Sequence, residues 1–401
     1  MARFKFSGRD LKGKKTGSIN AGSKRDALLQ LKEKGVKVTE INEVPETLLT
    51  KDIQLGSGVK SQQFVIFLRQ FATLIRAGVS LVDSTSILAA QTESKALKKA
   101  LLDVEVDLRS GRPLSEAAAK HKRIFSNMFI NMVRAGEAGG RIDETLDRLA
   151  VYYEKQHDTK QKVISALMYP AVLSVVAVGV VIFLLVSVVP TFVDMFNDFG
   201  GELPVITKFV MNASAFMQAY WWLILILAIG LVAAIMVIRN QQKSRYYFDY
   251  ALLRIPIFGK VLQKAVIARM TRTLSSLFAS SVPILESMRI VENVVDNEVI
   301  ARVIRESHDS LEQGQSLTVP MKTHWVFPPL VSQMIAIGEE SGALDEMLSK
   351  VADFYEKEVE TTTERLKSLI EPVMIIILAA LVGTIVLSIM IPMFKIYQYV
   401  G

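Results

Sequence analysis

Three long stretches of the chain contain no charged residue and no histidine, although the sequence around them is rich in charge. Their limits are residues 163–193, 209–238 and 372–394. A helix crosses a bilayer with about 20 apolar residues, and a buried helix of a soluble protein seldom keeps so many positions free of charge. We therefore predict three transmembrane helices, at residues 169–190, 220–238 and 372–394.

Outside these stretches the apolar positions recur with the period of an α-helix. Phe64, Phe67, Leu68 and Phe71 follow an i, i+3, i+4, i+7 pattern, and polar residues such as Arg69 face away from this stripe. Breaks between successive helices fall at residues 78, 111–113, 136 and 139–140. Several helices of ordinary length, joined by short breaks, predict an antiparallel helical bundle.

The chain contains an internal duplication. Arg69 and Arg272 align at a separation of 203 residues, and beyond Phe125 the separation becomes 202. The aligned pairs include Ser84/Ser287, Gly111/Gly314, Gly136/Gly338, Glu137/Glu339, Gly140/Gly342, Asp143/Asp345, Tyr153/Tyr355, Pro170/Pro372 and Pro190/Pro392. A repeat of this length predicts two copies of one structural unit. Each copy is a helical domain that leads directly into a span, with prolines near the two ends of that span.

The first 44 residues follow a different pattern. Phe4 and Phe6 alternate with charged residues, as in a strand, and Lys12-Gly13-Lys14 suggests a turn. A short helix is expected near residues 27–35, followed by a closing strand near residues 36–41. This segment is predicted to be a small α/β module, followed by a Gly- and Ser-containing linker.

The predicted fold class is mainly α: a polytopic membrane protein with three transmembrane helices, two duplicated cytoplasmic antiparallel helical bundles and a small N-terminal α/β module. Its predicted segments are 1–44 (module), 45–60 (linker), 61–168 (first bundle), 169–190 (first span), 191–219 (outer loop), 220–238 (second span), 239–371 (second bundle), 372–394 (third span) and 395–401 (outer tail).

Charge predicts the orientation of this arrangement. The chain of 401 residues has a net charge of +7, and residues 1–168 hold 29 Lys and Arg against 19 Asp and Glu. The segment between the first two spans has one Lys against three acids, whereas basic residues follow the second span directly. Since Lys and Arg accumulate on the cytoplasmic side, we predict a cytoplasmic N-terminus and an outer C-terminus.

Several kinds of chemistry are disfavoured by the residues present. There is no Cys, and His121, His157, His308 and His324 are scattered, so neither a thiolate nor a histidine metal site is expected. The spans lack the ionisable groups that pumps and ion-coupled transporters use, and neither phosphate-binding glycine motif is present. We therefore predict no catalytic residue, no cofactor and no enzyme activity. Basic residues beside the spans suggest anionic lipid headgroups rather than nucleic acid.

The most distinctive local motif occurs once in each copy, at residues 135–143 and 337–345, which we call the two Gly-Glu turns. Their candidate residues are Gly136, Glu137, Gly140, Asp143, Gly338, Glu339, Gly342 and Asp345. Glycines end one helix in a conformation that a Cβ atom disfavours, and the following Asp complements the dipole of the next helix. A structural turn is one interpretation, and contact of Glu137 and Glu339 with a partner is the other. The acidic residues near Asp143 and Asp345 have two interpretations. They form either a solvent-exposed acidic face of a helix or a site that binds a cation.

These motifs, together with Tyr169-Pro170 and Glu371-Pro372 at the start of two spans and Pro190 and Pro392 at their ends, resemble one family over nearly the whole chain. It is the type II secretion F family, whose members include the inner-membrane platform proteins of type IV pili. The segments Leu252–Gly259 and 198–204 also resemble sequence features of this family. The N-terminal module is similar to that of the pilus branch. Ser281 departs from the pattern, since the first copy has Gly78, and Val151 stands where calcium-binding members are expected to need an acid, so no metal is predicted.

The resemblance implies a role in assembling a pilus or pseudopilus in the bacterial inner membrane. The implied partners are a cytoplasmic hexameric motor ATPase, pilin or pseudopilin transmembrane helices, other inner-membrane assembly proteins, membrane lipids and further copies of the chain, as a dimer or trimer. Pilus assembly is the leading hypothesis. Type II secretion and a DNA-uptake pseudopilus remain alternatives, and a transporter or channel is a more remote one.

Overall fold

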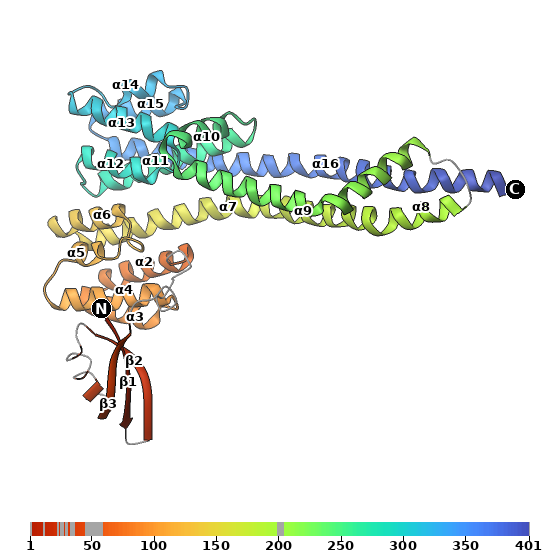
Figure 1. The fold of residues 1–401 in the computed structure, drawn as a ribbon. Coiled ribbons are helices and arrows are strands. Elements are labelled where there is room, and N and C mark those ends of the chain that lie inside the picture. Colours follow the sequence, from red (N-terminus) through yellow and green to blue (C-terminus); the bar gives the residue numbers. More distant parts are fainter. Residues whose placement is uncertain are drawn as a thin grey trace. The chain divides into compact units, whose positions relative to one another are not determined.

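The computed structural model describes residues 2–10, 13–21, 24, 28, 31–32, 37–44, 59–198 and 204–400. The chain divides into two compact units, Met1–Ser57 and Gly58–Gly401 (Figure 1). The larger unit is helical and contains three helices that are long and apolar enough to cross a membrane. The predicted fold class, with duplicated helical domains and a small N-terminal module, is confirmed.

The N-terminal unit contains a three-stranded antiparallel sheet of order β2-β1-β3, made from Ala2–Asp10, Gly13–Ala21 and Lys37–Val44. Phe6 and Ile41 pair across strands β1 and β3, and both side chains are buried together with Leu31. Gly17 lies opposite Phe6, and a Cβ atom there would be 3.2 Å from the Phe6 ring. The helix expected near residues 27–35 falls mostly outside the described residues.

The first bundle consists of six helices whose apolar stripes face a common core. They are α2 (Ser61–Arg76), α3 (Leu81–Gln91), α4 (Lys95–Arg109), α5 (Leu114–Ala119), α6 (Asn127–Ala138) and the first part of α7 (Ile142–Phe183). Serine side chains cap three of these helices, because the hydroxyl oxygens of Ser80, Ser94 and Ser126 accept backbone N–H groups. Phe71, Leu97 and Phe129 are fully buried in this core.

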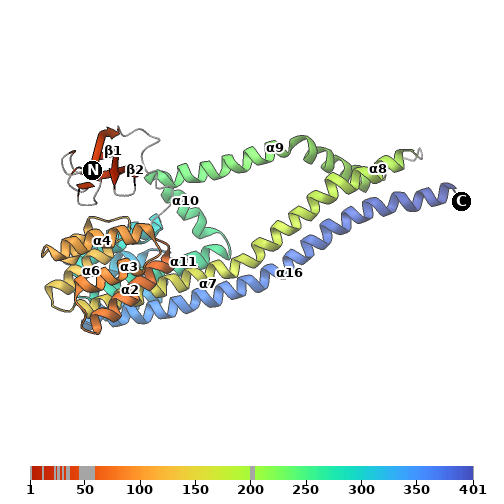
Figure 2. The ribbon, with the colours of Figure 1, turned by 90° about the horizontal axis from the view of Figure 1, so that it is seen from below.

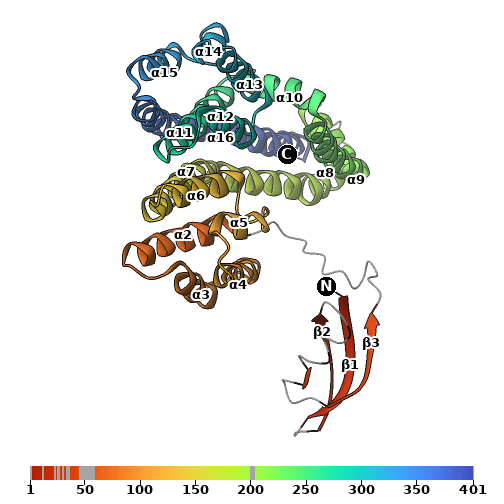
Figure 3. The same cartoon turned by 90° about the vertical axis from the view of Figure 1, so that its left-hand side faces the viewer.

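The second bundle repeats this order. It comprises α10 (Gln242–Arg254), α11 (Phe258–Ala279), α12 (Ile284–Val294), α13 (Glu298–Glu312), α14 (Thr318–Thr323), α15 (Pro329–Ser341) and the first part of α16 (Leu344–Val400). Helices α11 to α16 correspond to α2 to α7, and buried apolar residues of both bundles form one continuous core. Figure 3 shows α7 lying between the rest of its own bundle and the α11–α16 pair.

The predicted spans are parts of longer helices that begin inside the bundles. Helix α7 continues through a single π-helical turn, η1 (Leu184–Val188), into α8 (Val189–Asp198). Pro170 lies inside α7, and both Pro372 and Pro392 lie inside α16, while Pro190 is in the first turn of α8. Figure 2 shows α7 and α16 side by side along most of their length. Helices α7 and α16 therefore run directly from the bundles into the first and third spans.

Two segments predicted to lie outside the spans, an outer loop and an outer tail, are largely helical, and their side of the membrane stays a prediction. Residues 191–219 were expected to be an outer loop, but α8 covers residues up to Asp198 and α9 (Val205–Asn240) starts again at Val205. The expected outer tail after residue 394 is the last part of α16. The helical parts of these segments, residues 191–198, 205–219 and 395–400, contain no proline or glycine, so the helices extend past the apolar segments.

Helix α9 changes its surroundings at a kink. Tyr220 has non-helical backbone angles, with φ −119° and ψ 15°. Before the kink, the hydroxyl groups of Thr207 and Ser214 donate hydrogen bonds to the carbonyl oxygens of Ser388 and Leu185, at 2.7 and 2.5 Å. After the kink, nearly every large apolar side chain as far as Ile238 is exposed, and α9 diverges from α7 and α16 (Figure 2).

The turn after α2 and the corresponding turn after α11 have the same backbone conformation but a different residue. Gly78 has φ +84°, and the corresponding Ser281 has φ +60°, which L-residues disfavour. The substitution of Ser281 for glycine thus leaves the turn geometry intact and costs backbone strain. We expect Ser281→Gly to stabilise the protein by about 0.5–1 kcal/mol, because glycine relieves this strain. Thermal unfolding of the purified protein measures this, with Ser276→Gly inside α11 as the control that should destabilise.

Candidate functional site

The Gly-Glu turn of the first bundle joins α6 to α7 at very close range. A Cβ atom on Gly136 would lie 2.4 Å from Thr145 Oγ1, so only glycine permits this approach of the two helices. Gly140 has φ +65° and lets the chain reverse direction. Asp143 follows in the first turn of α7, where its charge complements the helix dipole. The structural interpretation of this turn is therefore supported at each of these positions.

The second Gly-Glu turn has the same construction. A Cβ atom on Gly338 would lie 2.9 Å from the Cα atom of Leu344. Gly342 has φ +72° and forms the left-handed end of α15, and Asp345 lies in the first turn of α16. Since α7 and α16 run from these turns toward the spans, both turns lie at the end of the bundles that is farthest from the membrane helices (Figure 1).

The two glutamates of the turns make hydrogen bonds within the protein. The Glu137 carboxylate accepts the backbone N–H groups of Leu114, at 2.5 Å, and Ser115, at 3.3 Å. Glu339 accepts the N–H of Leu317, at 3.2 Å, and the hydroxyl of Ser316, at 2.5 Å. Each glutamate thus satisfies free N–H groups at or just before the start of a short helix, α5 or α14. A partner-contact role for these residues stays a prediction.

We expect Glu137→Ala to destabilise the protein by about 1–2 kcal/mol, because it leaves two backbone N–H groups at the start of α5 without their acceptor. Glu137→Gln keeps one acceptor oxygen and should lose less. Chemical denaturation of the purified protein compares the two variants. Equal stability of Glu137→Ala and the wild type would contradict the capping role.

An arginine on α2, and its counterpart on α11, forms ion pairs with acidic residues on α7 and α16 respectively. Arg69 lies 2.6 Å from Glu154 and 3.0 Å from Asp147, and the hydrogen bond that Arg69 donates to Glu154 raises the pKa of Arg69. Arg69 does point away from the apolar stripe, as expected, but sequence reasoning missed these partners on α7. A guanidinium therefore occupies the neighbourhood of Asp147, which was one of the acids considered for a cation.

In the second bundle this cluster is more deeply buried. Arg272 lies 2.8 Å from Glu356 and also pairs with Asp353. The side chains of Arg272 and Glu356 are only 11% and 14% exposed. Burial alone would lower the pKa of Arg272, but the hydrogen bonds and charges of Glu356 and Asp353 raise it. Ser349 takes the place of Asp147 and accepts a hydrogen bond from Arg272 at 3.3 Å.

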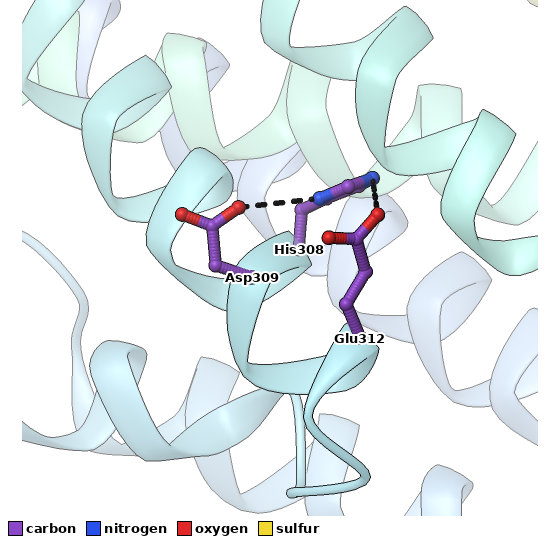
Figure 4. Close-up of side chains that lie close together, drawn as sticks. All are labelled: His308, Asp309 and Glu312. Atoms are coloured by element: carbon purple, nitrogen blue, oxygen red, sulfur yellow. Dashed lines mark hydrogen bonds and ion pairs between the residues drawn. The ribbon is translucent and has the colours of Figure 1, made fainter.

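A further cluster, not singled out from the sequence, lies on α13. His308, Asp309 and Glu312 place their potential metal-binding atoms within 4.8 Å of one another (Figure 4). The guanidinium of Arg289 is 3.3 Å from His308 Nε2 and 3.8 Å from Glu312. A positive side chain therefore stands where a cation would have to bind. The i, i+4 spacing of His308 and Glu312 on one helix was the signal that could have revealed this cluster.

The two bundles contact each other along one face. Tyr152 of α7 hydrogen-bonds Thr273 of α11 at 3.1 Å, and the Asn131 amide donates to Glu286 of α12 at 3.3 Å. Lys155 lies 3.5 Å from Glu356 of α16. These contacts use the α6 and α7 side of the first bundle and the α11, α12 and α16 side of the second.

The chain matches family models along most of its length. The model described as Type II secretion system (T2SS), protein F matches residues 67–190 and 270–392, and its N-terminal domain model matches residues 1–42. The two matched ranges of the first model agree with the internal duplication.

Relatives from both branches of this family align with almost the whole chain. The chain is 40% identical to "Type IV pilus assembly protein PilC" of Thermus thermophilus, over 99% of this chain and 98% of the relative. It is 36% identical to "Type IV pilus assembly protein TapC" of Aeromonas hydrophila, over 99% and 96%. "Type II secretion system protein F" of Vibrio cholerae is 32% identical, over 98% of each chain.

Proposed function

Since the chain belongs to the type II secretion system protein F family, we propose that it is the inner-membrane platform of a type IV pilus assembly machine. The observation that carries this proposal is full-length similarity to pilus assembly proteins at 40% and 36% identity, against 34% and 32% for two secretion relatives of similar coverage. The family is one of multi-pass membrane proteins and not an enzyme family. The proposed role is accordingly mechanical.

The long helices are suited to passing movement from the cytoplasm into the membrane. Helix α16 has 57 residues, so it is about 85 Å long, and it runs without interruption from the second bundle through the third span. Helix α7 leads from the first bundle into the first span over 42 residues and continues through the π-helical turn η1 into α8. A tilt or rotation imposed on the bundles by a hexameric motor ATPase would therefore reach the spans directly.

The contact with the motor is proposed at the Gly-Glu turns. Asp143 and Asp345 are exposed there, at the end of the bundles farthest from the spans, whereas the carboxylates of Glu137 and Glu339 are engaged within the fold. Asp143→Lys combined with Asp345→Lys should reduce co-purification of the motor at least tenfold, because both charges reverse. Asp103→Lys on α4 is the control. Equal recovery of the motor with the wild type, the double variant and the control would contradict this contact.

The contact with pilin helices is proposed at α9. After the Tyr220 kink its apolar side chains lack neighbours among the described residues, and α9 diverges there from α7 and α16. A bilayer lipid or an apolar partner helix suits such a surface. A photo-reactive residue at Leu227, which is 69% exposed, should capture the major pilin in membranes, while one at buried Val210 should not.

The proposed orientation has the N-terminus in the cytoplasm and the C-terminus outside. A reporter enzyme that is active only outside the membrane should work when fused at Gly401, and a cytoplasmic reporter at that site should not. The reverse result would overturn the orientation and, with it, contact of the bundles with a cytoplasmic motor. Type II secretion and DNA uptake remain the alternative settings, and the secretion relatives support the first of them.

A further inference from the structure

The contact between the two bundles is not reciprocal, although the bundles are copies of one unit. If the copies were related by a local two-fold axis, the counterparts of each contact would also meet. Asn131 meets Glu286, but the corresponding Gln333 and Asp83 make no contact with each other among the described residues. Tyr152 meets Thr273, but no contact between the corresponding Phe354 and Gln70 occurs in the described part of the chain. The first bundle therefore uses one face and the second bundle uses a different one.

Among the described residues of the larger unit, each bundle consequently has one of these two faces left without a neighbour. On the second bundle it is the α15/α16 surface, defined by Gln333, Phe354 and Lys357. On the first bundle it is the α2/α3 surface, defined by Gln70, Asp83 and Ile87. No hydrogen bond or ion pair joins α15 or α16 to α2 or α3 within the described part of the chain.

Corresponding apolar residues are buried at the contact within the chain but exposed on the free surfaces. Tyr152 is 3% exposed at the contact within the chain, whereas its counterpart Phe354 is 48% exposed. Ile290 is 4% exposed beside Ile130, whereas its counterpart Ile87 is 38% exposed. Large apolar side chains are thus uncovered at the positions that the internal contact covers.

The polar chemistry of the contact is also preserved on the free surfaces. The amide of Asn131 and the carboxylate of Glu286 correspond to the amide of Gln333 and the carboxylate of Asp83. The ion pair of Lys155 with Glu356 corresponds to Lys357 with Glu154. Both pairs keep a donor opposite an acceptor.

We infer that a second copy of this chain docks its α15/α16 surface on the α2/α3 surface, repeating between chains the contact that the two bundles make within one chain. Such a contact joins two different faces, so copies follow one another head to tail, in a closed ring or an open array according to the rotation between them. The ion pairs of Lys155 with Glu356 and of Lys162 with Glu360 show that α7 and α16 are parallel, so repetition keeps all the spans pointing the same way.

The repeated contact should end before the membrane. The counterpart of the Lys162–Glu360 pair would be Glu364 with Asp158, which places two carboxylates together. Neighbouring chains should therefore be held at the bundles and diverge toward the spans. This inference concerns assembly of the chain itself and does not depend on the proposed role in pili.

Cross-linking of the full-length chain tests the inference, because the natural sequence has no cysteine. Gln333→Cys with Asp83→Cys, treated in membranes with a short bismaleimide, should give covalent dimers and larger species. Neither single variant should do so, since the two faces differ. Asn131→Cys with Glu286→Cys is the matched control, in which the cross-link forms within one chain and the mass stays that of a monomer.

Two outcomes would overturn the inference. One is the absence of covalent oligomers from the Gln333/Asp83 variant while the Asn131/Glu286 control reacts. The other is efficient dimer formation by either single variant, which indicates a two-fold contact. A second readout uses Phe354→Glu, which should dissociate the detergent-purified oligomer at least tenfold more readily, while Leu102→Glu, 46% exposed on α4, should leave it unchanged.

Discussion

Replacing Arg272 with methionine should lower the free energy of unfolding by about 3 kcal/mol, because removing one partner of a buried ion pair leaves the other charge uncompensated. Glu356 is the charge that would remain, and it is 14% exposed. Lys155, at 3.5 Å, would compensate for only part of the loss.

The corresponding change in the first bundle is the control. Arg69 is 39% exposed, so water screens its interaction with Glu154 and Asp147, and Arg69→Met should cost about 1 kcal/mol or less. Denaturant unfolding of the detergent-purified protein compares the two variants under one set of conditions. Equal losses would show that the difference in burial between the two clusters has no energetic consequence.

Replacing Gly136 with valine should destabilise the protein by about 2–3 kcal/mol, because the new side chain has no room between α6 and α7. Its Cβ atom alone would lie 2.4 Å from Thr145 Oγ1 and 2.8 Å from Thr145 Cβ. The helices would have to separate at the point where α7 begins. Since α7 continues into the first span, the change should also impair pilus assembly under the proposed function.

Ala138→Val provides the matched control for this prediction. Ala138 is on the same helix but is exposed, so the added methyl groups meet solvent and the change should stay within about 0.5 kcal/mol. Thermal unfolding and pilus counts should therefore separate the two variants. Wild-type behaviour of Gly136→Val would show that α6 and α7 are not held at the close distance described here.

The main features of the fold follow from local sequence patterns. Charge-free stretches reveal the spans, and the stripe of Phe64, Phe67, Leu68 and Phe71 reveals the first helix of the bundle. The duplication adds long-range information, because it predicts that Gly338 has the same structural role in the second bundle as Gly136 has in the first. These signals depend on neighbours in sequence or on repetition, so one sequence is enough to read them.

Contacts between distant segments could not be predicted in the same way. Nothing in the sequence near Glu137 indicates that it caps a helix starting at Leu114, and nothing near Arg69 identifies Glu154 as its partner. The sequence also does not reveal that Pro170, predicted at the start of the first span, lies within a continuous helix that begins in the bundle. The surrounding residues favour helix strongly enough there to tolerate the loss of one backbone hydrogen bond.

The measurement that tests the central claim most directly is a count of surface fibres on a deletion strain and on the same strain complemented with this chain. Electron microscopy of sheared surface material gives the count, and the protein content of the medium is followed in parallel. The account predicts that pili disappear on deletion and return on complementation, while secreted proteins are unaffected. Normal pili on the deletion strain, with exported proteins retained inside the cell, would contradict the pilus assignment and place the chain in a secretion machine.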